Sequence, residues 1–162
     1  MDVNSQELSE ISLTDQVKRK EIRMNQIILA SHGGMSAGLK NTLELILGEL
    51  PNVHAVATTR DETEPVTAST RRLLDGFAPG DKAYVLTDVM GGSVNNDMMT
   101  LLADYPDLTV ICGTNACLAL NLASCDDPIT DEELEEFLNQ ARSQIVNCRK
   151  MLQDASAEED DL

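Results

Sequence analysis

The stretch ILASHGGMSAGL, from Ile28 to Leu39, joins a short apolar run to a helical pattern through a histidine and two glycines. The residues before Ser31 are typical of a buried strand, and the apolar spacing after Met35 is typical of a helix. A strand that turns directly into a helix is the repeating unit of proteins built on a parallel sheet. Because His32 stands at the turn, the same stretch also presents the first candidate for chemistry.

Strand and helix patterns alternate along the chain from Asn25 onward. The predicted strands are nearly all apolar and cover 26–30, 53–59, 82–88 and 108–113. The predicted helices cover 36–50, 65–76, a segment from Ser93 to the break at Pro106, a segment from Asn115, and 131–152 after a capping-box pattern at Thr130 and Glu133. Strands that are apolar on both faces need helices on both faces. The pattern therefore predicts an α/β fold with an open, mainly parallel sheet.

Length and composition indicate one folded domain that does not span a membrane. The 162 residues suit a single core, and we expect an N-terminal extension over 1–23, the domain over 24–153 and an acidic disordered tail over 154–162. No apolar run reaches the roughly 20 residues of a membrane span. The polar, acidic start is unlike a secretory signal, so we expect a cytoplasmic protein.

Charge and cysteine spacing narrow the classes of partner and cofactor. The net charge of -16 disfavours nucleic acid and anionic membrane surfaces, and it favours a basic protein partner. The four cysteines form no C-x-x-C pair, and only two histidines could join them. This spacing predicts reduced thiols rather than a disulfide framework or a zinc site.

Two glycine-containing loops follow the first and third predicted strands. They are SHGG, residues 31–34, and DVMGGSVNN, residues 88–96. In open parallel sheets, ligand chemistry gathers beyond the carboxyl ends of the strands. If the first and third strands are neighbours, these two loops meet in space.

The first loop suits anion chemistry on His32. Gly33 and Gly34 let the backbone bend and expose N–H groups, and the following helix points its positive end at the same place. A phosphoryl group on His32 would find these amides and the hydroxyl of Ser36 or Ser31. The alternative for His32 is a structural histidine in a turn.

The second loop supplies a carboxylate and further donors. Asp88, at the end of its strand, can accept the Nδ1–H of a neighbouring imidazole, which leaves Nε2 as the nucleophile. Gly91 and Gly92 form a flexible turn, and Ser93 stands where the next helix begins, so all three are candidate phosphate ligands. The alternative is that Asp88 and Ser93 only cap local structure.

Other candidates are weaker. Met35 and Met90 lie in the two loops and could offer a soft contact surface to a partner. His54 has no cysteine or carboxylate cluster near it in the sequence, so we expect a structural or surface role.

The two loops resemble those of the enzyme IIA component of the mannose family of the bacterial sugar phosphotransferase system. In that family a strand ends in a small or hydroxyl residue followed by His-Gly, a D-x-x-G-G-S-P-x-N loop follows the third strand, and G-x-N follows the fourth. Here these are Ser31-His32-Gly33, Asp88 to Asn96, and Gly113-Thr114-Asn115. Val94 replaces the proline, and Met90 replaces an aromatic residue that is common before the glycines.

The resemblance implies a phosphocarrier that covers about 25–150. His32 would accept a phosphoryl group from the carrier protein HPr and pass it to a separate enzyme IIB during uptake of a mannose-class sugar. Asp88 would orient His32, and Ser93 and loop amides would hold the phosphoryl group, with no cofactor and no metal. It also implies a homodimer, in which a C-terminal antiparallel edge strand can be exchanged, and an indirect link to the membrane through the IIC and IID permease.

Three alternatives remain open at this stage. A related IIA-like subunit feeds dihydroxyacetone kinase, although GGSVNN argues for the sugar branch. A receiver-like signalling domain would use Asp88 as its phosphoacceptor, but the acidic pair expected after the first strand is replaced by Ser31 and His32. A hydrolase is suggested by His-Gly-Gly as an oxyanion loop, but G-x-S-x-G is absent.

Overall fold

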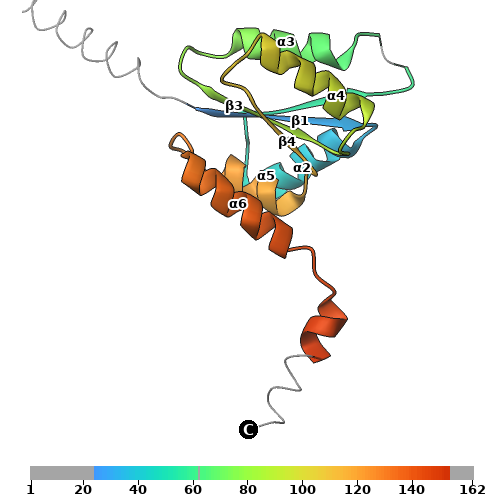
Figure 1. The fold of residues 1–162 in the computed structure, drawn as a ribbon, viewed down its shortest axis with the longest axis vertical. Helices are drawn as coiled ribbons and strands as arrows, with labels where there is room; N and C mark the ends of the chain where they lie inside the picture. The colour runs from blue at the N-terminus through green and yellow to red at the C-terminus, as the bar shows by residue number, and fades with distance from the viewer. Residues whose placement is uncertain (1–23, 62, 154–162) are drawn as a thin grey trace, which may run out of the picture.

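The centre of the protein is a parallel sheet of four strands in the order β2-β1-β3-β4 (Figure 1). The computed structural model describes residues 24–61 and 63–153. The strands are β1 (Asn25–His32), β2 (Val53–Thr58), β3 (Lys82–Thr87) and β4 (Thr109–Cys112). The predicted α/β class is confirmed, whereas the N-terminal extension and the acidic tail lie outside the described residues.

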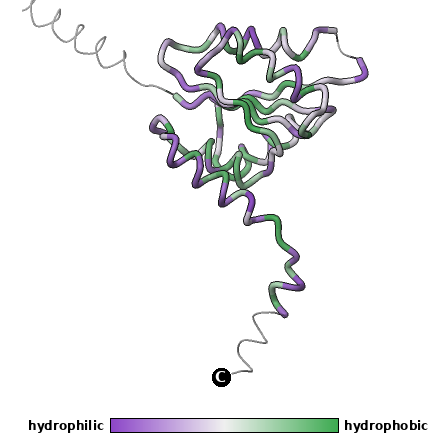
Figure 2. The backbone as a smooth tube through the Cα atoms, in the orientation of Figure 1, coloured by the Kyte–Doolittle hydropathy of each residue, from purple (hydrophilic) through white to green (hydrophobic). Residues whose placement is uncertain are grey.

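Helices cover both faces of this sheet. They are α2 (Met35–Leu47), α3 (Val66–Gly76), α4 (Ser93–Thr100) with the short 3-10 turn η1 (Leu101–Ala103), α5 (Ala116–Ala123) and α6 (Asp131–Ser143). Helices α3 and α4 lie on one face, and α2, α5 and α6 lie on the other (Figure 1). Figure 2 shows the apolar strands enclosed between these two layers.

Alternating side chains of the central strands fill two separate cores. Ile27 and Leu29 of β1 pack against the α2, α5 and α6 side, while Ile28 and Ala30 pack against the α3 and α4 side. All four are at most 1% exposed. A strand with this pattern is stable only between two helical layers, which explains the apolar run in the sequence.

Helix α2 is shorter than predicted because it ends at Leu47. Gly48 follows with a φ of 90° and a ψ of -163°, a conformation that favours glycine and cannot continue a helix. Leu43 is buried on the sheet side, but Ile46 and Leu47 are 59% and 41% exposed. The helical spacing of the sequence predicts one apolar face formed by Leu39, Leu43, Ile46, Leu47 and Leu50. For Ile46 and Leu47 this prediction is wrong, because both are exposed.

The C-terminal region departs most from the predicted helix over 131–152. Helix α6 begins with the predicted capping box at Thr130 and Glu133 but ends at Ser143. Residues 145–147 are not helical, and a second helical segment runs over 148–153. The side chain of Asn147 accepts a hydrogen bond from the Lys150 N–H, which caps this second segment. The C-terminal antiparallel edge strand implied by the resemblance is not formed within the described residues.

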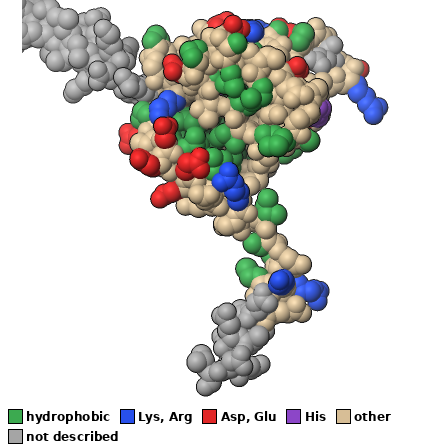
Figure 3. Space-filling view, in the orientation of Figure 1, with side chains coloured by type: hydrophobic (Ala, Val, Ile, Leu, Met, Phe, Trp, Pro, Cys, Tyr) green, Lys and Arg blue, Asp and Glu red, His purple; other side chains and the backbone are tan. Residues whose placement is uncertain are grey.

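Acidic side chains gather on one part of the surface, and the cysteines form no disulfide. Figure 3 shows acidic side chains gathered over the side of the molecule where α6 begins, and Asp131, Glu132 and Glu133 lie in the first turn of that helix. All four cysteines are free thiols. Within residues 24–61 and 63–153, no helix has the length and apolarity needed to cross a membrane.

Candidate functional site

The two glycine loops meet at the carboxyl edge of the sheet, as predicted. Strands β1 and β3 are hydrogen-bonded neighbours in parallel, with Leu29 opposite Leu86 and Ala30 opposite Thr87. Both strands therefore end at the same edge. The turn after β3 brings Asp88 beside the backbone and the ring of His32, which ends β1.

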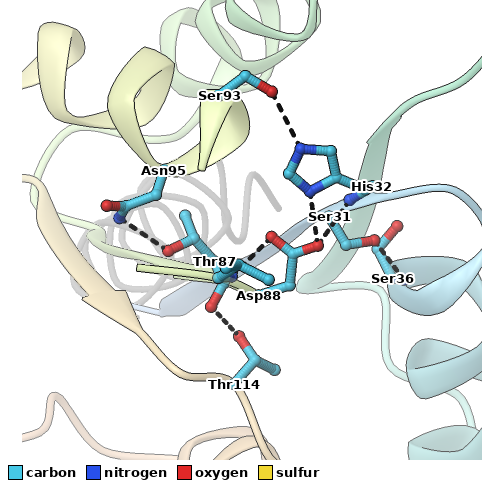
Figure 4. A network of polar contacts seen from close by, with 9 residues as sticks. Ser31, His32, Ser36, Thr87, Asp88, Ser93, Asn95 and Thr114 are labelled. Atoms are coloured by element: carbon cyan, nitrogen blue, oxygen red, sulfur yellow. Dashed lines mark hydrogen bonds and ion pairs between the residues drawn. The ribbon is translucent and has the colours of Figure 1, made fainter. Parts of the chain in front are cut away.

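His32 is held between a carboxylate and a hydroxyl (Figure 4). Its Nδ1 lies 2.9 Å from Asp88 Oδ2, which also accepts the His32 backbone N–H at 2.8 Å. Its Nε2 lies 3.0 Å from the Oγ of Ser93. Because an ionised carboxylate can only accept, Nδ1 carries the proton in the neutral ring. The lone pair is then on Nε2.

Asp88 is ionised under the conditions in which this pair works. Burial, the largest single influence, raises the pKa of its carboxyl. The hydrogen bonds from the His32 backbone, the His32 ring and the Val89 N–H act in the opposite direction, and the net result is a pKa below the ordinary value. The carboxylate thus remains an acceptor for Nδ1–H across the neutral range.

The ring is accessible, whereas its carboxylate partner is not. The side chain of His32 is 44% exposed and that of Asp88 is 8% exposed. Gly92 packs close to the ring, since a Cβ built there would lie 3.3 Å from His32 Cε1. Gly33 turns the chain away after β1 with a φ of 60°. The imidazole is therefore fixed on the side of Asp88 and Gly92, while the rest of the ring is open to solvent.

A second set of polar contacts holds the loop that carries Ser93. The amide of Asn95 donates to Thr87 Oγ1 at 3.0 Å, and its oxygen accepts the Gly91 N–H at 3.2 Å. Thr114 adds a hydrogen bond from its Oγ1 to the carbonyl of Thr87. Asn95 thus connects the end of β3 with the glycine turn, and so sets Ser93 relative to Asp88. Asn95 and Thr87 are not among the predicted site residues; the signal in the sequence is an asparagine placed directly after the apolar Val94, and the structure shows it to be buried.

Three of the predicted phosphate ligands are engaged elsewhere. Ser36 is 2% exposed, its backbone N–H is donated to Ser31 Oγ, and its hydroxyl makes no hydrogen bond within the described part of the chain. The Gly33 N–H is donated to the Thr58 carbonyl, and the Gly91 N–H to Asn95. The backbone N–H groups of these three residues are therefore bound by neighbouring parts of the chain, and the Ser36 hydroxyl has no partner among the described residues but is buried.

The other predicted ligands are placed differently. Gly34 is the N-cap residue of α2, and its carbonyl accepts the Gly38 N–H. Gly92 lies close to the ring but offers no free donor, because its N–H is donated to the Val89 carbonyl. Ser93 is the candidate ligand whose hydroxyl is in contact with Nε2.

The two loops that carry His32 and Asp88 also carry exposed apolar side chains. Met35, Val89 and Met90, from the two loops beside the site, are 45%, 57% and 83% exposed. Exposed methionines give an adaptable apolar surface. The predicted contact residues Met35 and Met90 are thus free to touch another molecule.

The second histidine of the chain has a structural setting. His54 Nε2 lies 3.2 Å from Gln26 Oε1, and its ring packs on Phe77. Burial first, and the charge of Lys40 second, lower the pKa of His54. No carboxylate orients this ring in the way that Asp88 orients His32 among the described residues.

Fold and site together define a small α/β protein with an exposed histidine held by a buried carboxylate at the carboxyl edge of a parallel sheet. The profile of the EIIA-man family, described as the PTS system fructose IIA component, matches residues 26–142. The chain therefore belongs to this family and is a mannose-family IIA component of the phosphotransferase system, as the resemblance of the two loops indicated.

Individual relatives agree with this assignment. The sorbose-specific EIIA component of Lacticaseibacillus casei is 24% identical over 138 residues, which are 84% of this chain and 99% of the relative. A solved structure of a protein from Klebsiella pneumoniae, named for a phosphoenolpyruvate-dependent sugar phosphotransferase system permease, is 31% identical with a TM-score of 0.72, covering 82% of this chain and 96% of its own. The mannose/sorbose specific IIA subunit from Enterococcus faecalis is 26% identical with a TM-score of 0.66, covering 76% and 94%.

Proposed function

We propose that the protein carries a phosphoryl group on Nε2 of His32, accepts it from phospho-HPr and delivers it to a separate enzyme IIB during uptake of a mannose-class sugar. The observation that carries this proposal is the pair of contacts on the ring: Asp88 at Nδ1, and an open edge at Nε2 bounded by Ser93. Membership of the IIA family supports the direction of transfer.

Asp88 performs two tasks in this reaction. Before transfer, its hydrogen bond to Nδ1–H keeps the lone pair on Nε2, where the phosphorus is attacked. As the new P–N bond forms and the bond to the donor histidine breaks, the ring of His32 becomes an imidazolium. The carboxylate at 2.9 Å then lies beside that positive charge and stabilises it.

Ser93 and the start of α4 suit the phosphoryl oxygens. In the free protein the hydroxyl donates to Nε2 at 3.0 Å, and once Nε2 is phosphorylated the same hydroxyl can turn to a phosphoryl oxygen. Helix α4 begins at Ser93, and the amides of the first helical turn have no carbonyl partner within the helix. These amides and the positive helix end replace the donors that we had assigned to Gly33 and Ser36.

The surroundings of His32 favour docking of a protein. Met35, Val89 and Met90, which lie close to His32 or Asp88 in the sequence, have exposed apolar side chains. The net charge of -16 attracts a partner with a basic contact face. A phosphohistidine on the partner would reach Nε2 from the open side.

A homodimer is part of the proposal. Among residues 24–61 and 63–153, strand β4 pairs only with β3, so within this part of the chain its outer edge presents unpaired backbone groups. A groove of about 320 Å³ beside this edge is lined by Val110, Cys112 and Leu138, among others. Ile145 and Val146, which follow α6, are 80% and 51% exposed. The segment after Ser143 of a second copy could add an edge strand here, and light scattering should then give twice the mass of one chain.

The experiment is transfer of labelled phosphate from phospho-HPr to the purified protein. We expect acid-labile, base-stable label on the wild type and on His54→Gln, and none on His32→Gln. The two variants remove one histidine each, so their comparison isolates the site. Label that persists on His32→Gln, or that behaves as an acyl phosphate and disappears in Asp88→Asn, would refute the proposal.

A second experiment identifies the protein that receives the phosphoryl group. The labelled protein is mixed in parallel with a mannose-class enzyme IIB and with the dihydroxyacetone kinase subunits. Loss of label to IIB supports the sugar branch, whereas loss to the kinase alone would overturn that assignment while leaving His32 as the carrier.

A further inference from the structure

The side chains of Asp88, His32 and Ser93 form a row of carboxylate, imidazole and hydroxyl (Figure 4). The carboxylate is 2.9 Å from Nδ1, and the hydroxyl is 3.0 Å from Nε2. The three residues come from separate places in the fold: the turn after β3, the end of β1 and the first turn of α4. This is the arrangement by which a serine is activated as a nucleophile, and it is recognised by geometry rather than by sequence order.

Asp88 determines which atom donates the proton in each hydrogen bond of this row. Its Oδ2 accepts both the backbone N–H and the Nδ1–H of His32, and its Oδ1 accepts the Val89 N–H. The neutral ring then has no proton on Nε2, so the Ser93 hydroxyl is the donor in the contact between them. The hydroxyl proton therefore already points at a base.

The position of Ser93 supplies the second requirement, which is a donor for developing negative charge. Ser93 is the first residue of α4, after the N-cap residue Gly92, and its hydroxyl contacts His32 Nε2. The N–H of Val94, the next residue, belongs to the first helical turn, where amides have no intrahelical acceptor. An amide directly after the nucleophile is a usual member of an oxyanion hole.

We propose that, in the unphosphorylated protein, Ser93 is an activated nucleophile that is acylated by small carboxylic esters. Ser93 Oγ bonds to the ester carbon while its proton passes to His32 Nε2. The bond from that carbon to the alcohol oxygen then breaks, and the proton on Nε2 goes to the departing alcohol. Water, activated by the same nitrogen, releases the acid from the acyl-serine and restores the hydroxyl. This activity lies beyond phosphate transfer and does not depend on it.

The shape of the site limits the ester. His32 is 44% exposed, and Val89 and Met90, which follow Asp88, are 57% and 83% exposed. A site this open gives an acyl chain little binding energy, so esters with good leaving groups and short acyl chains are the substrates of this site. An acyl group on Ser93 would also occupy the place beside Nε2 that a phosphoryl group needs. Acylation and phosphorylation should therefore exclude each other.

The test uses p-nitrophenyl acetate and the full chain. We expect an initial burst of p-nitrophenol, and an acetyl group on the peptide that contains Ser93 by mass spectrometry of acid-quenched protein. Ser93→Ala should remove both, and it should still fold because Gly92 is the N-cap residue of α4 and alanine suits the first helical position. His32→Gln, which removes the base, should lower the acylation rate by about 100-fold or more. Asp88→Asn should lower it too, because the amide no longer enforces the tautomer. Ser124→Ala changes an exposed serine away from these loops and should behave as wild type.

Two results would overturn the proposal. One is an unchanged rate in Ser93→Ala with acetyl transfer to His32, which would make the imidazole itself the nucleophile. The other is acetylation of Ser93 at a rate that His32→Gln and Asp88→Asn leave unaltered. Phosphorylation by phospho-HPr is measured on the same preparations. Failure of the ester reaction with normal phosphorylation refutes this inference alone, and the reverse result refutes the proposed function alone.

Discussion

Two adjacent glycines in the second loop have different physical roles, and replacing each by alanine should separate them. A Cβ on Gly92 would lie 3.1 Å from the Val89 carbonyl oxygen and 3.3 Å from His32 Cε1. The φ of Gly92 is -69°, so alanine fits its backbone conformation. Gly91 has a φ of 74°, but a Cβ there would meet no atom within 4 Å. Gly92 is therefore needed for space beside the ring, and Gly91 for its backbone conformation.

These geometries translate into opposite effects on stability and activity. Gly92→Ala must displace the ring or the turn by a few tenths of an ångström, and since a 1 Å displacement costs about 100-fold, we expect phosphorylation to slow by roughly three- to tenfold. Its free energy of unfolding should change by less than about 1 kcal/mol, because the tight contact is offset by a less flexible unfolded chain. Gly91→Ala places alanine in the left-handed region, which costs about 1–2 kcal/mol of stability. The less flexible unfolded chain offsets about 0.4–1 kcal/mol of this cost. It should lose roughly 1 kcal/mol and keep its rate.

Urea unfolding gives the free energies, and the initial rate of labelling by phospho-HPr gives the activity. The NMR signals of the His32 ring provide a third readout, which should move in Gly92→Ala and stay in Gly91→Ala. The reasoning is refuted if Gly91→Ala slows labelling more than Gly92→Ala does. It is also refuted if Gly92→Ala leaves both the ring signals and the rate unchanged.

Three further predictions concern stability, and urea unfolding tests each of them. Asp88 has a pKa below its ordinary value in the folded protein. Its contribution to stability is therefore present above the usual aspartate pKa of about 3.9 and is lost as the pH falls through the lower folded value. The stability difference between wild type and Asp88→Asn should shrink from pH 6 to pH 3, and a constant difference would contradict the linkage. Thr130→Ala removes the hydroxyl that caps α6 and bonds Glu133, so it should cost about 1 kcal/mol while phosphorylation stays normal; an unchanged stability would show that the capping box contributes nothing. Met98 is 0% exposed, so Met98→Ala should cost about 2–5 kcal/mol, whereas Met99→Ala, 49% exposed in wild type, should cost less than about 0.5 kcal/mol; equal losses would contradict the assignment of the core.

The alternation of elements could be read from the chain because it depends on local patterns. Apolar runs such as QIILA can be buried on both sides only in a sheet with two helical layers, and the glycines after them mark the turns. The end of the last helix could not be read in the same way. No glycine or proline separates Ser143 from Asn147, so periodicity alone extended the helix, and the side-chain cap by Asn147 was the weaker signal.

In the candidate site, too, the features that depend on local sequence could be predicted and those that depend on packing could not. His32, Asp88 and Ser93 were predicted because each stands at a strand end or helix start, which are local features. Ser36 was misjudged because its N–H is bound by Ser31 and its hydroxyl is buried, and burial depends on the elements packed above it. The contact of Asn95 with Thr87 was missed because it joins a helix to a strand across the turn.

The sequence by itself determined the class of fold and the candidate histidine and carboxylate, since each of these residues stands at the carboxyl end of a predicted strand, where ligand sites of parallel sheets gather. The tertiary structure decided which donors remain available there. In the first loop the Gly33 N–H is donated to Thr58 and the Ser36 N–H to Ser31, whereas Ser93 at the start of α4 faces Nε2. The reason is physical: each N–H forms its hydrogen bond with whatever acceptor the packed chain places nearest, and that acceptor is known only when distant segments have been brought together.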